Sequence, residues 1–170
     1  TILQALARLL RNANVKKVLQ NGIYDNTFMF ERYGMVIANM EDTMIAHGVL
    51  LPDFPKTLAF LCSIYTRHPY YKDDGKLRFK GFLTDDYSYW RYSAQDSLAT
   101  LEVWTKLKGD VVRMQLWDTY RAHVGIIEPL MQMQWFGQKM DSAKMQQAVL
   151  EGEELVTKLR AELNALCGGV

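Results

Sequence analysis

The sequence contains only two short stretches with the composition of β-strands, and helical patterns fill most of the remainder. Residues 15–19 form a short stretch with β-branched and apolar residues that ends before Asn21-Gly22, and residues 35–37 form a second such stretch. Two short parallel strands make a poor sheet on their own, and parallel sheets are normally buried between helices. We therefore predict a predominantly helical α/β fold, and we expect this chain to be part of a domain whose other strands lie elsewhere.

Helical spacing of apolar residues extends over most of the chain. The predicted helices cover residues 2–10, 24–32, 42–48, 56–65, 84–107, 111–136 and 142–166. We expect Gly109-Asp110 to separate the fifth helix from the sixth, and Gly125 and Pro129 to break or kink the sixth. The last helix would be about 37 Å long. It cannot bury its apolar stripe against itself, so we expect it to pack on residues 111–136 as an antiparallel pair.

The composition narrows the class of protein. With 49% hydrophobic and 23% charged residues, the chain resembles a globular protein and not a disordered tail. The net charge of +1 is spread evenly, so a nucleic-acid site would have to be local. No apolar run is long enough to span a bilayer, so we expect no membrane partner. Cys62 and Cys167 match no metal spacing and no signal peptide is visible, which predicts an intracellular, cytoplasmic protein with reduced thiols.

The first candidate site follows the first predicted strand. There the chain turns at Asn21-Gly22, and a helix begins with Asp25 in its first turn. Ligands of α/β folds bind at the carboxyl ends of the strands, which is where Asn21 and Asp25 are expected to lie. A purely structural interpretation stays open, in which Asp25 complements the helix dipole and Asn21 makes the turn.

The second candidate site is the pair Tyr92 and Asp96. The two residues are four positions apart and therefore share one face of the predicted helix. An apolar stripe lies on roughly the opposite face and consists of Tyr87, Trp90, Ala94, Leu98 and Leu101. A phenol beside a carboxylate can orient a water molecule at a metal, but the pair could also be exposed to solvent without function. If Asp25 and Asp96 converge, their repulsion should raise the pKa of at least one of them.

No other segment carries a recognisable catalytic motif. The histidines share no metal spacing, and no phosphate-binding loop or nucleophile elbow occurs. Residues 68–80 form a loop with many aromatic and basic side chains, Tyr70 and Tyr71 among them. We expect the side chains of this loop to be the ones most available for contacts at the surface of the protein.

Taken in order, these segments resemble the proofreading region of family A DNA polymerases, the polymerase I-like group. Residues 20–25 are similar to the second exonuclease motif, Asn-x-x-x-Asp, and residues 92–96 to the third, Tyr-x-x-x-Asp, which is followed by Ala-Thr-Leu. Residues 41–46 are similar to the family's Asp-Thr-Met-Leu helix start. Residues 128–130 and 137–141 resemble the start of the polymerase domain, where a helix ends in Gly-x-x-hydrophobic-Asp and a long helix leads into the thumb.

The resemblance implies a fold and an activity. Residues 1–108 would form a partial ribonuclease-H-like 3'-5' exonuclease domain, and residues 109–170 the thumb-base helices that begin the polymerase domain, as a long helical pair. The parent would be a DNA polymerase of DNA replication that removes mismatched 3'-terminal nucleotides by hydrolysis with two Mg²⁺ or Mn²⁺ ions held about 4 Å apart. Residues 69–76 resemble phage members of the family, so the parent would act in a bacterial cell or a phage-infected host.

The resemblance also implies roles for individual residues. Asp25 and Asp96 would be metal ligands, and Tyr92 would orient the attacking water. Asn21 would contact the DNA end. Tyr70 or Tyr71 would stack on unpaired bases of the single-stranded 3' end of a primer–template, because stacking on aromatic rings tolerates any base.

One departure from the family pattern bears on activity, since its first motif, Asp-x-Glu, does not occur before Asp25. We therefore expect an internal piece of the polymerase that is inactive alone and whose partners are DNA and the remaining polymerase segments. Two alternatives stay open. One is a stand-alone ribonuclease-D-like exonuclease, against which the helices after Lys108 argue. The other is a non-catalytic helical interaction module in which the acids are helix caps.

Overall fold

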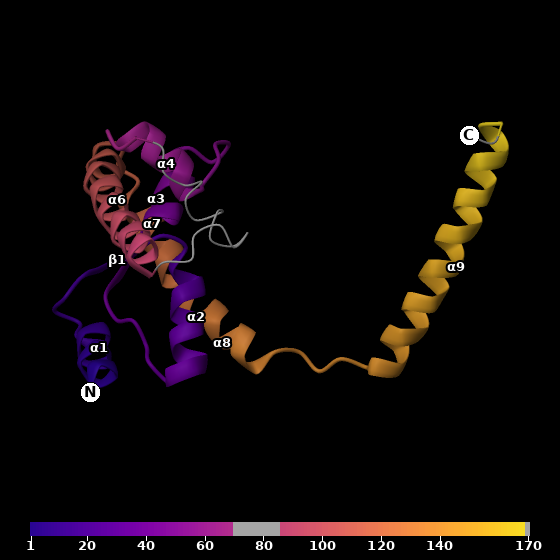
Figure 1. The fold of residues 1–170 in the computed structure, drawn as a ribbon, viewed down its shortest axis with the longest axis horizontal. Helices are drawn as coiled ribbons and strands as arrows, with labels where there is room; N and C mark the ends of the chain where they lie inside the picture. The colour runs from indigo at the N-terminus through magenta and orange to yellow at the C-terminus, as the bar shows by residue number, and fades with distance from the viewer. Residues whose placement is uncertain (70–85, 169–170) are drawn as a thin grey trace. The chain divides into compact units, whose positions relative to one another are not determined.

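The computed structural model describes residues 1–69 and 86–168, which divide into two compact units, Thr1–Trp135 and Phe136–Val170 (Figure 1). Most described residues are helical, which confirms the predominantly helical α/β class. The elements are α1 (Ile2–Arg11), β1 (Lys17–Leu19), α2 (Gly22–Tyr33), β2 (Met40–Asp42), α3 (Thr43–Leu50), α4 (Leu58–Tyr65), α6 (Asp86–Arg113), α7 (Trp117–Gly125), α8 (Ile127–Phe136) and α9 (Ser142–Leu166).

The two strands of the first unit form a parallel pair connected by α2. Lys17 lies opposite Met40, and Leu19 opposite Asp42. The strand predicted within residues 15–19 is confirmed, but the prediction of a strand at residues 35–37 is wrong. The backbone N–H of Ile37 donates to the Asn26 side chain at 3.1 Å instead of to a neighbouring strand, and Asn39, with a φ of 51°, turns the chain before β2 begins.

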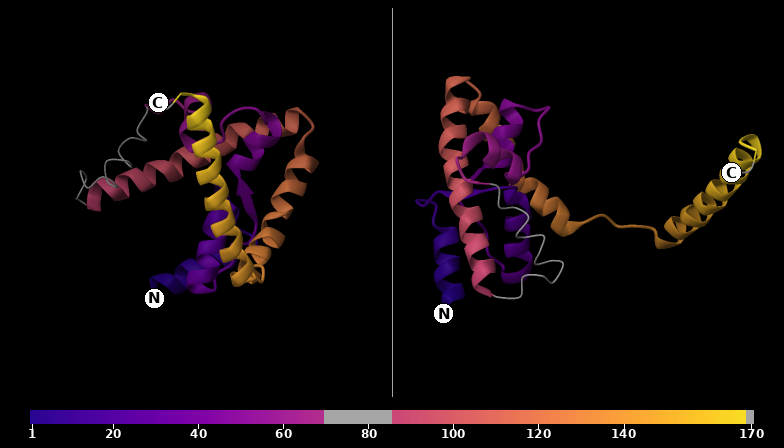
Figure 2. Two further views of the ribbon diagram at one scale, coloured as in Figure 1. Left: turned by 90° about the vertical axis from the view of Figure 1, so that its right-hand side faces the viewer. Right: turned by 45° about the horizontal axis from the view of Figure 1, so that its top comes forward.

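Helix α6 is longer than predicted. It continues without a joint through Gly109 and Asp110 for 28 residues, as Figure 2 shows. It ends instead at Arg113, because Gln115 has a φ of 58° and reverses the chain. The predicted break at Gly125 is confirmed, since α7 ends there. Pro129 causes no break, because it lies in the first turn of α8, where a missing N–H removes no helical hydrogen bond.

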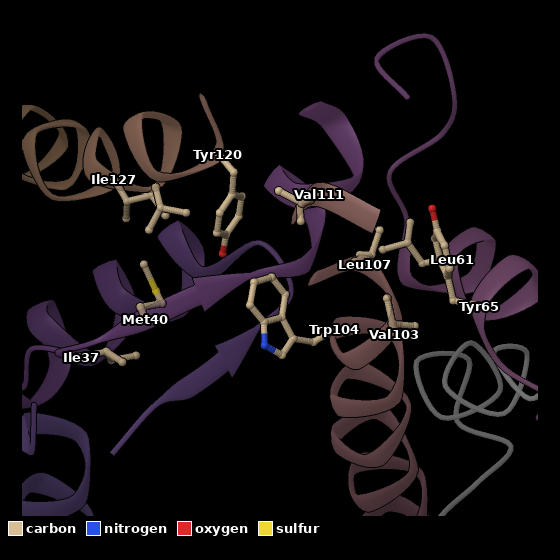
Figure 3. Close-up of a cluster of buried hydrophobic side chains, with 12 residues drawn as sticks. Ile37, Met40, Leu61, Tyr65, Val103, Trp104, Leu107, Val111, Tyr120 and Ile127 are labelled. Atoms are coloured by element: carbon tan, nitrogen blue, oxygen red, sulfur yellow. The ribbon is translucent and has the colours of Figure 1, made fainter. Parts of the chain in front are cut away.

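The core of the first unit forms around the C-terminal half of α6. Its buried face packs against α3, α4, α7 and β1. Figure 3 shows the side chains of this core: Ile37, Met40, Leu61, Tyr65, Val103, Trp104, Leu107, Val111, Tyr120 and Ile127. The core therefore holds α7 and the start of α8 in the same unit as the two strands.

The apolar stripe seen in the sequence of α6 lies on the solvent side of the helix. The exposed fractions are 72% for Tyr87, 65% for Trp90 and 57% for Leu98. The buried face instead follows from Tyr92 and Asp96, which are half-buried, to Thr100 and the core residues beyond it. Asp96 does lie away from the apolar stripe. Its side of α6 is therefore the one that faces the rest of its unit.

The second unit consists mainly of α9. The predicted helix over residues 142–166 is confirmed, and Asp141 caps it by accepting the Lys144 N–H at 3.1 Å. The predicted packing of this helix as an antiparallel pair stays a prediction. In the described part of the chain, no helix combines the length and the apolar character that crossing a membrane requires.

Candidate active site

The carboxyl ends of the two strands meet at the start of α2. Asn21 follows β1 with φ 64° and ψ 50°, a left-handed conformation that asparagine adopts more readily than most residues, and makes the predicted turn. Gly22 then begins α2 so close to the strands that an added Cβ would lie 2.7 Å from the Met40 Sδ and 2.9 Å from the Leu19 Cδ1. The absence of a side chain at Gly22 therefore allows α2 to begin directly against the sheet.

Asp42, at the end of β2, fixes the starts of two helices with one carboxylate. Its Oδ2 accepts the Gly22 N–H of α2 at 2.5 Å, and its Oδ1 accepts the Ile45 N–H of α3 at 3.0 Å. Asp42 is thus the N-cap of α3, within the range where the helix start was predicted. Because both oxygens accept backbone hydrogen bonds, this buried carboxylate is committed to holding the backbone at the strand ends.

Asp25 lies in the first turn of α2 and is half-buried. Burial raises the pKa of its carboxyl, and the nearby Asp42 carboxylate raises this pKa further, against a smaller opposing effect of a backbone hydrogen bond. Burial also raises the pKa of Asp42. The pKa of Asp25 is thus raised by burial and by Asp42, and the predicted convergence of Asp25 and Asp96 stays a prediction. Two carboxyl groups that resist ionisation together favour a cation beside them.

Tyr92 and Asp96 both lie on α6. Tyr92 is two turns before Thr100, and Asp96 is one turn before it. Both residues are half-buried, and the Thr100 hydroxyl donates to the backbone carbonyl of Asp96 at 2.7 Å. Helix α6 contacts β1, so the pair belongs to the same unit as Asp25. Tyr70 and Tyr71, the predicted DNA-stacking residues, lie outside the described residues. The described residues contain no group of three or more His, Cys, Asp or Glu side chains arranged to hold a metal ion.

Sequence analysis missed the buried cluster beside the site. Glu41, 1% exposed, accepts a hydrogen bond from the Tyr120 hydroxyl at 2.7 Å and pairs with Lys16 at 2.7 Å and Arg121 at 3.5 Å. The Tyr120 hydroxyl in turn accepts the backbone N–H of Asp42 at 2.9 Å. Glu41 precedes Asp42 in the sequence, but no local pattern joins it to a tyrosine 79 positions away.

The close approach at Gly22 gives a first testable prediction. Gly22→Ala should lower the free energy of unfolding by about 1–3 kcal/mol, because its new Cβ must displace the Met40 and Leu19 side chains. Gly109→Ala is the matched control, since no atom lies within 4 Å of its added Cβ. That change should stabilise α6 by roughly 0.5–1 kcal/mol. Chemical denaturation of the two variants measures both effects, and equal effects would contradict the close packing of α2 on the strands.

The carboxyl at Asp25 gives a second prediction, on pH. A folded-state pKa above the ordinary value means that this group stabilises the fold below its ordinary pKa, and that the stabilisation is lost as the pH rises through the folded-state pKa. In metal-free buffer, Asp25→Asn should therefore raise the melting temperature at about pH 7 more than at about pH 3. Asp118→Asn, at an exposed acid on α7, is the control for the loss of one carboxylate. A larger gain in melting temperature at about pH 3 than at about pH 7 would contradict the assigned direction of the pKa shift of Asp25.

The segment that contains these residues matches a known protein family. Residues 1–111 match the sequence model of the 3'-5' exonuclease domain, and a search of curated proteins finds no match. The matched segment includes both strands and every described residue predicted for the site. It also covers well over half of the chain, and on this basis the chain belongs to the 3'-5' exonuclease domain family of the A-type DNA polymerases.

Proposed function

We propose that this chain is part of a DNA polymerase of DNA replication and contributes to the site that removes the 3'-terminal nucleotide. The observation that carries the proposal is the half-buried Asp25 at the carboxyl ends of the strands, with a pKa raised by burial and by Asp42. A carboxylate held in this way gains most from a divalent cation. The match to the 3'-5' exonuclease family supports a nucleic-acid substrate, and the group that would approach such an ion is the terminal phosphodiester of a DNA strand.

The donor set fits Mg²⁺ or Mn²⁺, since the acids are hard oxygen ligands. Asp25 and Asp96 would hold the ions, whereas Asp42 has both oxygens engaged by backbone N–H groups. Two bound divalent ions supply activation of a water and stabilisation of the leaving 3' oxygen. The hydroxyl of Tyr92 would orient the attacking water by hydrogen bonding. The Asn21 amide would bind the terminal nucleotide, and Tyr70 or Tyr71 would stack on unpaired bases.

Two carboxylates are too few to fix two ions, so we propose that further acids come from a strand bearing Asp-x-Glu in a ribonuclease-H-like sheet. Among the described residues, β1 pairs only with β2, and its other edge has no strand partner. A strand added there would bring its side chains to the end of β1, where α2 begins and Asp25 lies in its first turn. Of the helices in residues 109–170 that were expected to start the polymerase domain, α9 in the second unit keeps the proposed role of a thumb-base helix, whereas α7 and the start of α8 pack in the core of the first unit. The parent would be a cytoplasmic polymerase of a bacterial cell or phage-infected host, with DNA and its own remaining segments as partners.

A comparison of two chains tests this function. The 170-residue chain should degrade a 5'-labelled single-stranded oligodeoxynucleotide no faster than its Asp25→Ala, Asp96→Ala double variant. A longer chain that supplies the Asp-x-Glu strand should remove nucleotides from the 3' end, with Mg²⁺ and not with a chelator. Robust activity of the shorter chain would mean that its own acids complete the site. No activity in the longer chain would contradict the proposed function.

A further inference from the structure

Tyr120 is the largest fully buried side chain in the described part of the chain. It belongs to α7, and its ring packs against two tryptophans, with centroids 5.5 Å from Trp104 and 5.4 Å from Trp117. Figure 3 shows its hydroxyl directed at the strands. The aromatic neighbours therefore restrict the ring, and the hydroxyl has a fixed position at the end of β2.

This hydroxyl joins two adjacent residues of β2. It accepts the backbone N–H of Asp42 at 2.9 Å and donates to the Glu41 carboxylate at 2.7 Å. Burial raises the pKa of Tyr120, so the phenol keeps the proton that it donates. Glu41 also pairs with Lys16 at 2.7 Å. A buried carboxylate that holds a hydroxyl in this way fixes both partners, because leaving either one unpaired is costly.

The same strand end determines where α2 begins. The Asp42 carboxylate receives the Gly22 N–H at 2.5 Å, and Gly22 is the first residue of α2. Asp25 follows three positions later, in the first turn of that helix. A displacement of the Asp42 backbone would therefore move the Asp42 carboxylate, the start of α2 and the Asp25 side chain together.

We propose that Tyr120 is a positioning residue of the exonuclease site, which holds Asp25 in place through Asp42 and Gly22; this inference rests on the proposed role of Asp25 as a metal ligand. Tyr120 lies beyond residues 1–111, the segment that matches the exonuclease family. The site would thus depend on a side chain from the helices that follow the family's exonuclease segment. Glu41 serves the same purpose by orienting the hydroxyl.

Tyr65 offers a matched control for Tyr120. It is also a buried tyrosine of the same core, and its hydroxyl lies 3.3 Å from the His47 Nδ1. Tyr65→Phe and Tyr120→Phe each remove one buried hydroxyl and keep the ring, so both variants should fold and both should lose some stability. Only the hydroxyl of Tyr120 contacts the strand end that positions α2.

The first measurement uses the 170-residue chain and needs no activity. In Tyr120→Phe, the backbone amide of Asp42 should exchange with solvent about five-fold faster, since it has lost its acceptor. The amide proton resonance of Gly22, shifted by its short bond to a carboxylate, should move. Tyr65→Phe should leave both amides unchanged. Unchanged amides in Tyr120→Phe would overturn the positioning role, whatever the activity of the protein.

The second measurement uses the longer chain that supplies the Asp-x-Glu strand. Tyr120→Phe should raise the Mg²⁺ concentration for half-maximal exonuclease rate by about ten-fold, the lower end of the effect of losing a direct partner of a metal ligand, because Tyr120 acts on Asp25 only through Asp42 and Gly22. Tyr65→Phe should not change it. In an Asp25→Asn background, Tyr120→Phe should have no further effect on this concentration, because the two residues act through one site.

The outcomes separate the two proposals. If Asp25→Ala leaves the exonuclease rate unchanged, or if the longer chain is inactive, the proposed function fails and the positioning role fails with it. If Asp25→Ala abolishes activity but Tyr120→Phe and Tyr65→Phe have the same Mg²⁺ dependence, the proposed function stands and the positioning role is overturned.

Discussion

In a longer chain that supplies the Asp-x-Glu strand, Asp25→Ala and Asp96→Ala should each lower the rate of Mg²⁺-dependent hydrolysis at the DNA 3' end by at least about 100-fold. Losing a residue that hydrogen-bonds to a metal ligand lowers activity by up to about 100-fold. Losing the ligand itself should lower activity by at least as much. The rate of release of the terminal nucleotide under single-turnover conditions measures the effect on the chemical step.

Asp118→Ala is the control for this first prediction. Asp118 is an exposed acid on α7, outside the proposed site, so its loss tests the change of net charge alone. The control should retain the full rate and the Mg²⁺ dependence of the unaltered chain. A loss of activity in Asp118→Ala equal to that in Asp96→Ala would contradict a specific role for Asp96.

The second large effect concerns the length of the folded unit. A chain of residues 1–111, the family-matched segment, should show no cooperative thermal transition, whereas residues 1–135 should unfold at the same temperature as all 170 residues. Removing residues after 111 deletes Tyr120, Val124, Ile127 and Met131 from the core. Their burial stabilises the fold by roughly 6–12 kcal/mol at 1.5–3 kcal/mol each. Whole domains are stable by only about 5–15 kcal/mol.

The shorter chain also loses the partner of a buried acid. Without Tyr120 and Arg121, the Glu41 carboxylate, 1% exposed, would keep only Lys16. Circular dichroism during heating distinguishes the three chains. A cooperative transition in residues 1–111 would support a domain boundary near residue 108, and its absence would extend the exonuclease unit to α8.

Local patterns identified most helices but not the second strand. The helix starts at Asp42 and Asp141 were predictable because an acid that caps a helix acts within three residues of itself. Strand β2 was missed because Met40-Glu41-Asp42 does not resemble a buried strand in the sequence. Its two buried acids accept hydrogen bonds from Gly22, Ile45 and Tyr120, and two of these donors are distant in the sequence.

Tertiary packing also decided two features of α6 against local signals. Gly109 did not interrupt the helix, because Leu107 and Val111 on either side of it are fully buried in the core. The periodicity gave the amphipathic character of this helix but not which face packs inward. Tyr92 and Asp96 were identified as a pair by spacing alone, and their half-buried position follows from the partners of the helix, which no spacing encodes.

The sharing of the Asp42 carboxylate between α2 and α3 has a consequence for how the unit comes apart. One acceptor group satisfies the first N–H of α2 and an N–H in the first turn of α3, so withdrawing it exposes both helix starts at once. Gly22 and Asp42 are only 20 positions apart, so this junction needs little loop closure to form. The segment from β1 to α3 should accordingly open and close as a single subglobal unfolding unit, with the strand pair and both helix starts sharing one opening free energy.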